Sequence, residues 1–341
     1  MNLVTPYRIS LIIPCYNVAD LVGRCIQSCL AQDIPAADYE IILVDDGSTD
    51  NTAEILFRLA PKSSNIRIIQ QKNLGLGGAR NTGLSNALGQ YVWFIDSDDW
   101  IAENCLSGLL EKAEAEQLDL LFFHANKILP DEVIQDFGAR ISGGPYRISE
   151  CSVQDIPLSS WVAIFRKDFL LSKRLFFAEH FLHEDTDFNI RVFAYDPTVF
   201  FLPEQYYFYD NRRMNSITNS KGIQMQQDNL RILERFVSFS REVTIAPQLD
   251  ASLFRYLFMV CVVSNYPLQF RFTSSALRMV KEYQRWIIET AVQGKYLPAL
   301  IIASSLKCSV LLFVFSLRFF QYLALLRNKV DKRKYKNGKN N

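Results

Sequence analysis

The first hundred residues alternate short apolar runs with helical patterns. Four apolar runs predict strands, at 9–13, 41–44, 66–69 and 91–95. After Asp20, which we expect to cap a helix, apolar residues recur on one helical face from 21 to 30. Further helices are expected from Asp50 or Asn51 and near 79–88. This alternation predicts an α/β protein with a mostly parallel sheet, covered by helices on both faces.

The pattern changes along the rest of the chain. Residues 130–150, rich in glycine and proline, predict a loop or short hairpin, and 161–165 and 198–202 predict further strands. After about residue 216 the pattern is helical with few glycines. We therefore divide the chain into a main domain, a helical C-terminal region and a basic tail, at 1–215, 216–326 and 327–341.

Polar loops follow three of the predicted strands, at Pro14–Asn17, Asp45–Ser48 and Asp96–Asp99. In parallel sheets ligands bind beyond the carboxyl ends of the strands, so these loops predict one binding edge. The glycines from Gly75 to Gly78 do not make a dinucleotide fingerprint. The last glycine of that motif is replaced by Arg80, and the loop follows the third strand rather than the first.

The acidic turn Asp96–Asp99 carries three carboxylates within four residues. Carboxylates this close repel each other unless water or a cation screens them. A Mg²⁺ or Mn²⁺ ion, which prefers oxygen ligands and shares them with substrate phosphates, would do so. The alternative is an exposed acidic turn that caps the next helix. The neighbouring polar strand ends favour the metal.

Charge and composition narrow the class of protein. With 37 basic and 36 acidic residues and 49% hydrophobic residues, the chain is expected to be globular, and a globally basic nucleic-acid binder is excluded. The seven cysteines contain no Cys-x-x-Cys pair, which favours buried thiols in a reducing compartment. No signal-like segment begins the chain, so we expect a cytoplasmic protein.

An apolar segment at 297–317 precedes the tail, which holds seven basic residues and one acidic residue. Lys307 and several serines interrupt the segment, so a buried core helix is one interpretation. Aromatic residues leading into a basic tail are also typical of docking at an anionic membrane surface. We predict peripheral binding to the cytoplasmic leaflet rather than a membrane span.

Four sequence blocks occur in order that resemble those of the family 2 glycosyltransferases. They are Pro14-Cys-Tyr16-Asn17, Val44-Asp45-Asp46-Gly47-Ser48, Asn73-x-Gly75-x-x-x-Ala79-Arg80-Asn81-x-Gly83 and Phe94-Ile-Asp96-Ser-Asp98-Asp99. The resemblance implies a GT-A fold with a C-terminal helical extension. It also implies inverting transfer of a sugar from a nucleotide diphosphate sugar, aided by a divalent cation, Mn²⁺ or Mg²⁺.

The resemblance assigns roles on the donor side, where Pro14, Tyr16 and Asn17 line the nucleotide. Tyr16 would stack on the base, although it could be an ordinary core tyrosine. Asp46 would accept a hydrogen bond from the uracil ring nitrogen, and Asp45 would support the turn, which could otherwise simply cap a helix.

Further roles follow for charged residues around the diphosphate. Arg80 would approach the diphosphate or nucleotide, Asp96 would bind the ribose or donor sugar, and Asp98 would ligate the metal. Arg213 would clamp the diphosphate as the site closes. The family usually carries another arginine where this chain has Asp210 or Asn211.

A general base is expected in His183-Glu184-Asp185-Thr186-Asp187, where the resemblance places it at Asp185. The alternative is that these acidic residues only begin a helix. His183 and His180 could ligate a metal or lie at the surface.

The function implied is transfer from a nucleotide diphosphate sugar, with a UDP-sugar favoured. The acceptor would be a saccharide or lipid-linked saccharide in bacterial surface polysaccharide synthesis. Two alternatives are a nucleotidyltransferase, which would usually have a glycine- and lysine-rich first loop, and an inactive sugar-nucleotide-binding module of an assembly complex.

Overall fold

The computed structural model describes residues 7–60, 63–130, 133–212, 223–258 and 260. The chain divides into two compact units between Ile245 and Ala246. Arg213, the apolar segment at 297–317 and the basic tail lie outside the described residues. Within the part that is described, no helix has the length and apolar character needed to cross a membrane.

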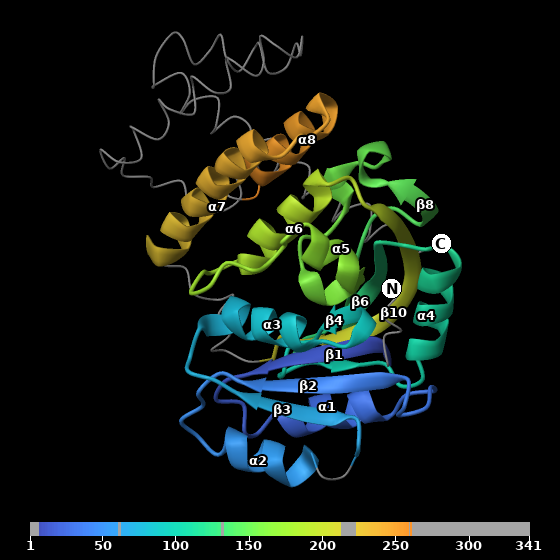
Figure 1. Ribbon diagram of the computed structural model, residues 1–341, viewed down its shortest axis with the longest axis vertical. Helices are drawn as coiled ribbons and strands as arrows, with labels where there is room; N and C mark the ends of the chain where they lie inside the picture. The colour runs from blue at the N-terminus through green and yellow to red at the C-terminus, as the bar shows by residue number, and fades with distance from the viewer. Residues whose placement is uncertain (1–6, 61–62, 131–132, 213–222, 259, 261–341) are drawn as a thin grey trace. The chain divides into compact units, whose positions relative to one another are not determined.

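Four parallel strands form the N-terminal half of the sheet, in the order β3-β2-β1-β4. Three helices connect them, and α3 and α2 lie on opposite sides of these strands (Figure 1). The four predicted strands are confirmed. The elements are β1 (Tyr7–Cys15), α1 (Val22–Leu30), β2 (Tyr39–Asp45), α2 (Thr52–Leu59), β3 (Ile66–Gln70), α3 (Gly75–Asn86) and β4 (Gly89–Phe94).

The other half of the same sheet is mixed. After β4 come β9, β6, β10 and β5, with β7 paired to β6 and β8 to β10. Only the β6–β10 pair is parallel here, so the mostly parallel arrangement holds for the N-terminal half alone. The strands are β5 (Trp100–Ile101), β6 (Leu120–Ile128), β7 (Val133–Phe137), β8 (Gly143–Arg147), β9 (Ala163–Arg166) and β10 (Thr198–Asp210).

The remaining helices follow the later strands. α7 belongs to the first compact unit and packs on α6, whereas α8 belongs to the second unit. The first helix of the predicted C-terminal region is therefore part of the same compact unit as the sheet. The helices are α4 (Leu106–Ala115), α5 (Lys167–Ser172), α6 (Glu184–Ala194), α7 (Ile223–Glu242) and α8 (Pro247–Phe258), with short 3₁₀ turns at Ile148–Glu150, Val153–Asp155 and Ser160–Val162.

Two helix starts differ from the sequence prediction. Asp20 does not cap α1, because a turn at Val18 precedes the helix and the Val18 carbonyl accepts the N–H groups of Leu21 and Val22. α3 begins at Gly75 rather than near 79, and its glycines permit close packing. A Cβ on Gly77 would lie 2.2 Å from the carbonyl oxygen of Ala178, so this helix must carry glycine there.

The cysteines described are all free thiols, as expected. Cys15, Cys25, Cys29 and Cys105 are buried, and Cys151 is partly buried. They pack as small apolar side chains.

Candidate active site

Three polar loops lie together at the carboxyl ends of β1, β2 and β4, because β1 lies between the other two strands. The N–H of Asp46 donates to the carbonyl of Cys15 over 2.9 Å. Asn17 accepts the N–H of Thr49 through Oδ1 over 2.8 Å. These bonds fix the first two loops against each other, at the edge that the strand pattern predicts.

The residues expected on the donor side differ in exposure. Tyr16 is 48% exposed, so its ring is open to a ligand rather than part of the core. Asp45 Oδ1 accepts the N–H of Ser48 over 3.0 Å and holds the turn. Asp46 is buried, and its Oδ1 accepts from the Gln71 side chain over 2.7 Å and from the Leu74 N–H over 2.8 Å. The contact of the Asp46 carboxylate with the nucleotide base stays a prediction.

Arg80 lies at the centre of a cluster of carboxylates. Its side chain is 1% exposed and projects from α3 between the acidic turn and the start of α6. It donates to Asp96 over 2.6 Å, to Glu184 over 2.6 Å and to Asp185 over 2.5 Å. Three carboxylates on one guanidinium leave an excess of negative charge. The expected contact of Arg80 with the diphosphate stays a prediction.

Asp185 stands in the first turn of α6, so the acidic cluster also begins a helix, as the alternative interpretation held. Its Oδ2 accepts the N–H of Ser160 over 3.1 Å, and its side chain is 18% exposed. Burial raises the pKa of Asp185, and the charge of Arg80 opposes that rise. Burial also raises the pKa of Glu184, to about 7. Asp185 is thus a carboxylate of reduced acidity, as suits a general base.

Asp99, the last residue of the acidic turn, is buried. Its Oδ2 accepts the Tyr207 hydroxyl over 2.7 Å, and its Oδ1 accepts the Asp210 N–H over 2.8 Å. The same Tyr207 oxygen accepts the N–H of Asp96 over 3.1 Å. Burial raises the pKa of Asp99, and the charges of Asp98 and Asp96 raise it further. Asp99 is thus a carboxyl group of reduced acidity, held by β10 next to two further carboxylates.

Arg24, on α1, braces this turn and was not found by sequence reasoning. It donates to the carbonyl of Asp98 over 2.9 Å and to Asp210 over 2.8 Å, and its guanidinium lies 3.7 Å from the centre of the Trp100 ring. The sequence carries one signal for Arg24. Asp210 stands at or next to a position where the family usually has an arginine, and an acidic residue there needs a cationic partner. Arg24 and Arg212 supply it.

The residues around the acidic turn fit a divalent cation. In the described residues, no group of three or more His, Cys, Asp or Glu side chains is arranged to hold a metal alone, and this includes His180 and His183. Mg²⁺ and Mn²⁺ do not require such a group, since phosphate oxygens and water complete their coordination. The carboxylate oxygens of the turn are ligands that this kind of ion prefers.

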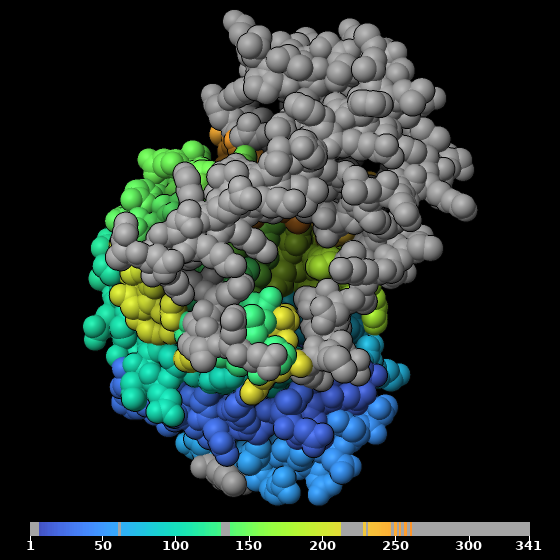
Figure 2. Space-filling model, turned by 180° about the vertical axis from the view of Figure 1, so that it is seen from behind, coloured from blue at the N-terminus to red at the C-terminus, as the bar shows by residue number. Residues whose placement is uncertain are grey.

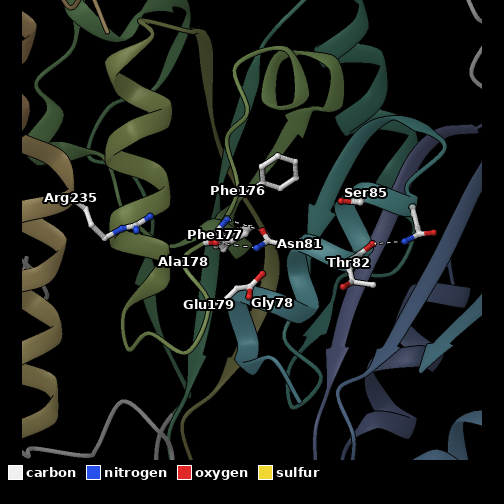
Figure 3. Close-up of a pocket in the computed structure, with 10 residues that line it drawn as sticks. Gly78, Asn81, Thr82, Ser85, Phe176, Phe177, Ala178, Glu179 and Arg235 are labelled. Atoms are coloured by element: carbon white, nitrogen blue, oxygen red, sulfur yellow. Dashed lines mark hydrogen bonds between the residues drawn. The ribbon is translucent and has the colours of Figure 1, made fainter. Parts of the chain in front are cut away.

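A hollow of about 640 Å³ lies on another face of α3, lined by Gly78, Asn81, Thr82 and Ser85 from the helix and by the loop 176–179 (Figure 3). Asn81 donates to the carbonyl of Phe177 over 3.0 Å and accepts its N–H over 2.8 Å. Arg80 and Asn81 are neighbours on α3. Arg80 binds Asp185, and Asn81 binds the loop 176–179, which leads to Asp185 along the chain. We interpret this wall of the hollow as structural.

The chain is similar to known glycosyltransferases. Residues 10–149 match the family model described as glycosyl transferase family 2. An uncharacterized glycosyltransferase, EpsJ of Bacillus subtilis (strain 168), is 33% identical over 218 residues, which cover 62% of this chain and 62% of EpsJ. The match thus spans less than two thirds of that relative.

Two solved structures share the fold. S. aureus TarS 1–349 in complex with UDP-GlcNAc has a TM-score of 0.68 and 20% identity, over 82% of this chain and 81% of TarS. The mannosyltransferase PcManGT of Pyrobaculum calidifontis, in complex with GDP-Man and Mn²⁺, has a TM-score of 0.55 and 16% identity, over 95% and 88% of the two chains. The fold predicted from the sequence, GT-A, is confirmed.

Proposed function

We propose that this chain is an inverting transferase, and the match of residues 10–149 to the glycosyl transferase family 2 model supports this. The chain would move a sugar from a nucleotide diphosphate sugar, with a UDP-sugar favoured, to a saccharide or lipid-linked saccharide of a bacterial surface polysaccharide. The observation that carries the proposal is the placement of Asp185. Arg80 joins this carboxylate to Asp96, so a candidate base lies beside the donor-side acidic turn.

In the proposed reaction Asp185 accepts the proton of an acceptor hydroxyl. The hydroxyl oxygen attacks the anomeric carbon from the face opposite the diphosphate and forms the new C–O bond. The bond between that carbon and the phosphate oxygen breaks, and the nucleoside diphosphate leaves with its electron pair. The raised pKa of Asp185 supports this role, because a less acidic carboxylate holds an accepted proton better.

On the donor side, the open ring of Tyr16 would stack on the base, beside Pro14 and Asn17. Asp46 would accept a uracil N–H through Oδ2, since its two hydrogen bonds described above use Oδ1. Asp96 would bind the ribose or donor sugar on the side of its carboxylate away from Arg80.

Asp98 would ligate a Mn²⁺ or Mg²⁺ ion at the acidic turn. When bound, the ion offsets negative charge on the departing diphosphate. Arg24 holds the carbonyl of Asp98 in place, which would fix the turn for this task. Arg80 contacts the donor side through its hydrogen bond to Asp96. Arg213 would add positive charge near the diphosphate.

We also propose that the chain works at the cytoplasmic face of the membrane. The support is in the sequence, where the apolar segment at 297–317 leads through aromatic residues to the basic tail. Peripheral docking would confine the enzyme to the plane of a lipid-linked acceptor.

The test is a panel of UDP-, GDP- and dTDP-sugars with Mn²⁺, scored for release of the nucleoside diphosphate and for thermal stabilisation. Metal-dependent release from one donor is expected. Formation of pyrophosphate from a nucleoside triphosphate and a sugar 1-phosphate would instead show a nucleotidyltransferase. Stabilisation by donors without turnover, even with varied acceptors, would favour an inactive binding module.

A further inference from the structure

Four aromatic rings form a continuous stack on one face of the sheet. The ring of Trp161 lies 4.7 Å from that of Tyr207, 5.5 Å from that of Tyr209 and 5.2 Å from that of Phe137, measured between ring centres. The angles between the ring planes are 24°, 21° and 29°. The three rings are therefore nearly parallel to the Trp161 indole, which contacts each of them.

The register of three strands explains this arrangement. Tyr207 of β10 is opposite Ala125 of β6, which is opposite Phe137 of β7. Since alanine separates the two aromatic residues in this row, the indole of Trp161 has room to lie against both. The carbonyl of Trp161 also accepts the Trp93 indole N–H over 2.9 Å, which fixes the turn that carries the indole.

Tyr207 and Trp161, the inner part of the stack, lie close to the candidate catalytic residues. The hydroxyl of Tyr207 bonds to Asp99 and to the N–H of Asp96 in the acidic turn. Ser160, the residue before Trp161, donates its N–H to Asp185. The stack thus begins at the acidic turn and passes one residue from the candidate base.

The outer end of the stack is open. Trp161 is 8% exposed, but Phe137 is 39% exposed on β7. Figure 2 shows the surface of the molecule from the side opposite to Figure 1. Phe137 therefore presents a ring to solvent while Trp161 supports it from behind.

We propose that the exposed face of Phe137 is a stacking platform for a saccharide ring of the acceptor, next to the sugar whose hydroxyl meets Asp185. This inference rests on the proposed function. A pyranose packs its C–H face on an aromatic ring, and a ring that neighbours already hold loses little freedom on binding. A single flat ring suits a sugar better than an acyl chain, which needs a groove.

The test uses the full chain with UDP and Mn²⁺ and four disaccharides as probes: cellobiose, lactose, N,N′-diacetylchitobiose and mannobiose. Saturation-transfer NMR measures their binding to wild type, Phe137→Ala, Phe137→Tyr and Phe57→Ala. Phe57, on α2, is a matched control because it is 53% exposed and lies outside the stack. We expect one disaccharide to bind wild type, Phe137→Tyr and Phe57→Ala alike, and Phe137→Ala to bind it about five- to tenfold more weakly.

UDP affinity, measured by calorimetry on the same four proteins, separates the two proposals. If wild type does not bind UDP, the proposed function fails and the platform fails with it. If all four bind UDP equally, equal disaccharide binding by wild type and Phe137→Ala overturns the platform alone. Binding of none of the four probes by wild type, or an equal loss in Phe57→Ala, also overturns it. Loss of UDP binding by Phe137→Ala would show that Phe137 supports the donor site, and would overturn the platform.

Discussion

Asp96 and Asp185 are held on the same guanidinium, that of Arg80, over 2.6 Å and 2.5 Å. One residue belongs to the turn proposed to bind donor and metal, and the other is the proposed base. A shift of either carboxylate would move the guanidinium and with it the other carboxylate. The buried arginine therefore fixes the distance between the proposed donor site and the proposed base.

Replacing Arg80 with glutamine is expected to lower the free energy of unfolding by about 3–5 kcal/mol, because it leaves buried carboxylates without a cation. The pKa values of Glu184 and Asp185 are already raised, and loss of Arg80 raises them further. A raised carboxyl pKa costs stability as pH rises, so the loss should be larger at pH 8 than at pH 5. Urea unfolding at both pH values measures it.

Arg8→Gln is the control, because Arg8 and Glu114 form an ion pair in which both side chains are 32% exposed. Loss of this ion pair should lower the free energy of unfolding by no more than about 1 kcal/mol. Equal losses for the two variants, or a loss for Arg80→Gln that does not depend on pH, would contradict a buried cluster.

Asp98→Asn should abolish transfer and leave the fold intact. Removing a carboxylate ligand weakens metal affinity, whereas a change in a partly exposed turn costs little stability. Donor hydrolysis is followed while Mn²⁺ is titrated, and Asp168→Asn, at an exposed position of α5, is the matched control. Full activity of Asp98→Asn at limiting Mn²⁺ would exclude Asp98 as a ligand.

Asp210→Asn should reduce stability at neutral pH by about 1–2 kcal/mol. Hydrogen bonds from Arg212 and Arg24 lower the pKa of Asp210, although the partial exposure of both arginines weakens their effect. A lowered carboxyl pKa contributes stability above its unfolded value, about 4, and that contribution is lost as pH falls. Thermal unfolding from pH 7 to about pH 2 should show the difference between wild type and variant begin to shrink below about pH 4, because the contribution is lost as pH falls toward the lowered folded pKa. A constant difference would refute the assignment.

Full-length protein should bind vesicles that contain anionic lipid at low salt, and high salt should partly release it. A variant with glutamine at the seven basic positions of 327–341 should bind them weakly. Cosedimentation measures both. Indifference of the unaltered chain to anionic vesicles at low salt would favour a core role for 297–317.

Local pattern predicts the N-terminal half of this fold well, because each strand there is a compact apolar run ended by polar residues. In the other half of the sheet, local pattern does not predict whether a strand runs parallel or antiparallel to its neighbours. β9 is four residues long, and nothing in its sequence says that it runs antiparallel to both β4 and β6. Direction there depends on the tertiary packing of neighbouring strands.

The candidate site divides in the same way. The acidic turn and the Asp45–Ser48 loop follow from strand ends, because parallel strands bring those ends together. The partners of Arg80 do not follow from local pattern, since Glu184 and Asp185 lie on a distant helix. Resemblance to a family places Asp185 in the site, but the contact that holds it is visible only in the structure.

The central claim is that Asp185 is the base and acts on the acceptor, not on the donor. The most direct measurement compares Asp185→Asn with wild type for UDP affinity by calorimetry and for donor hydrolysis at saturating donor, with water as the acceptor. We predict UDP affinity within about twofold of wild type and a rate at least about 100-fold lower. Collapse of UDP affinity with a rate at saturation that persists would place Asp185 in the donor site and contradict the claim.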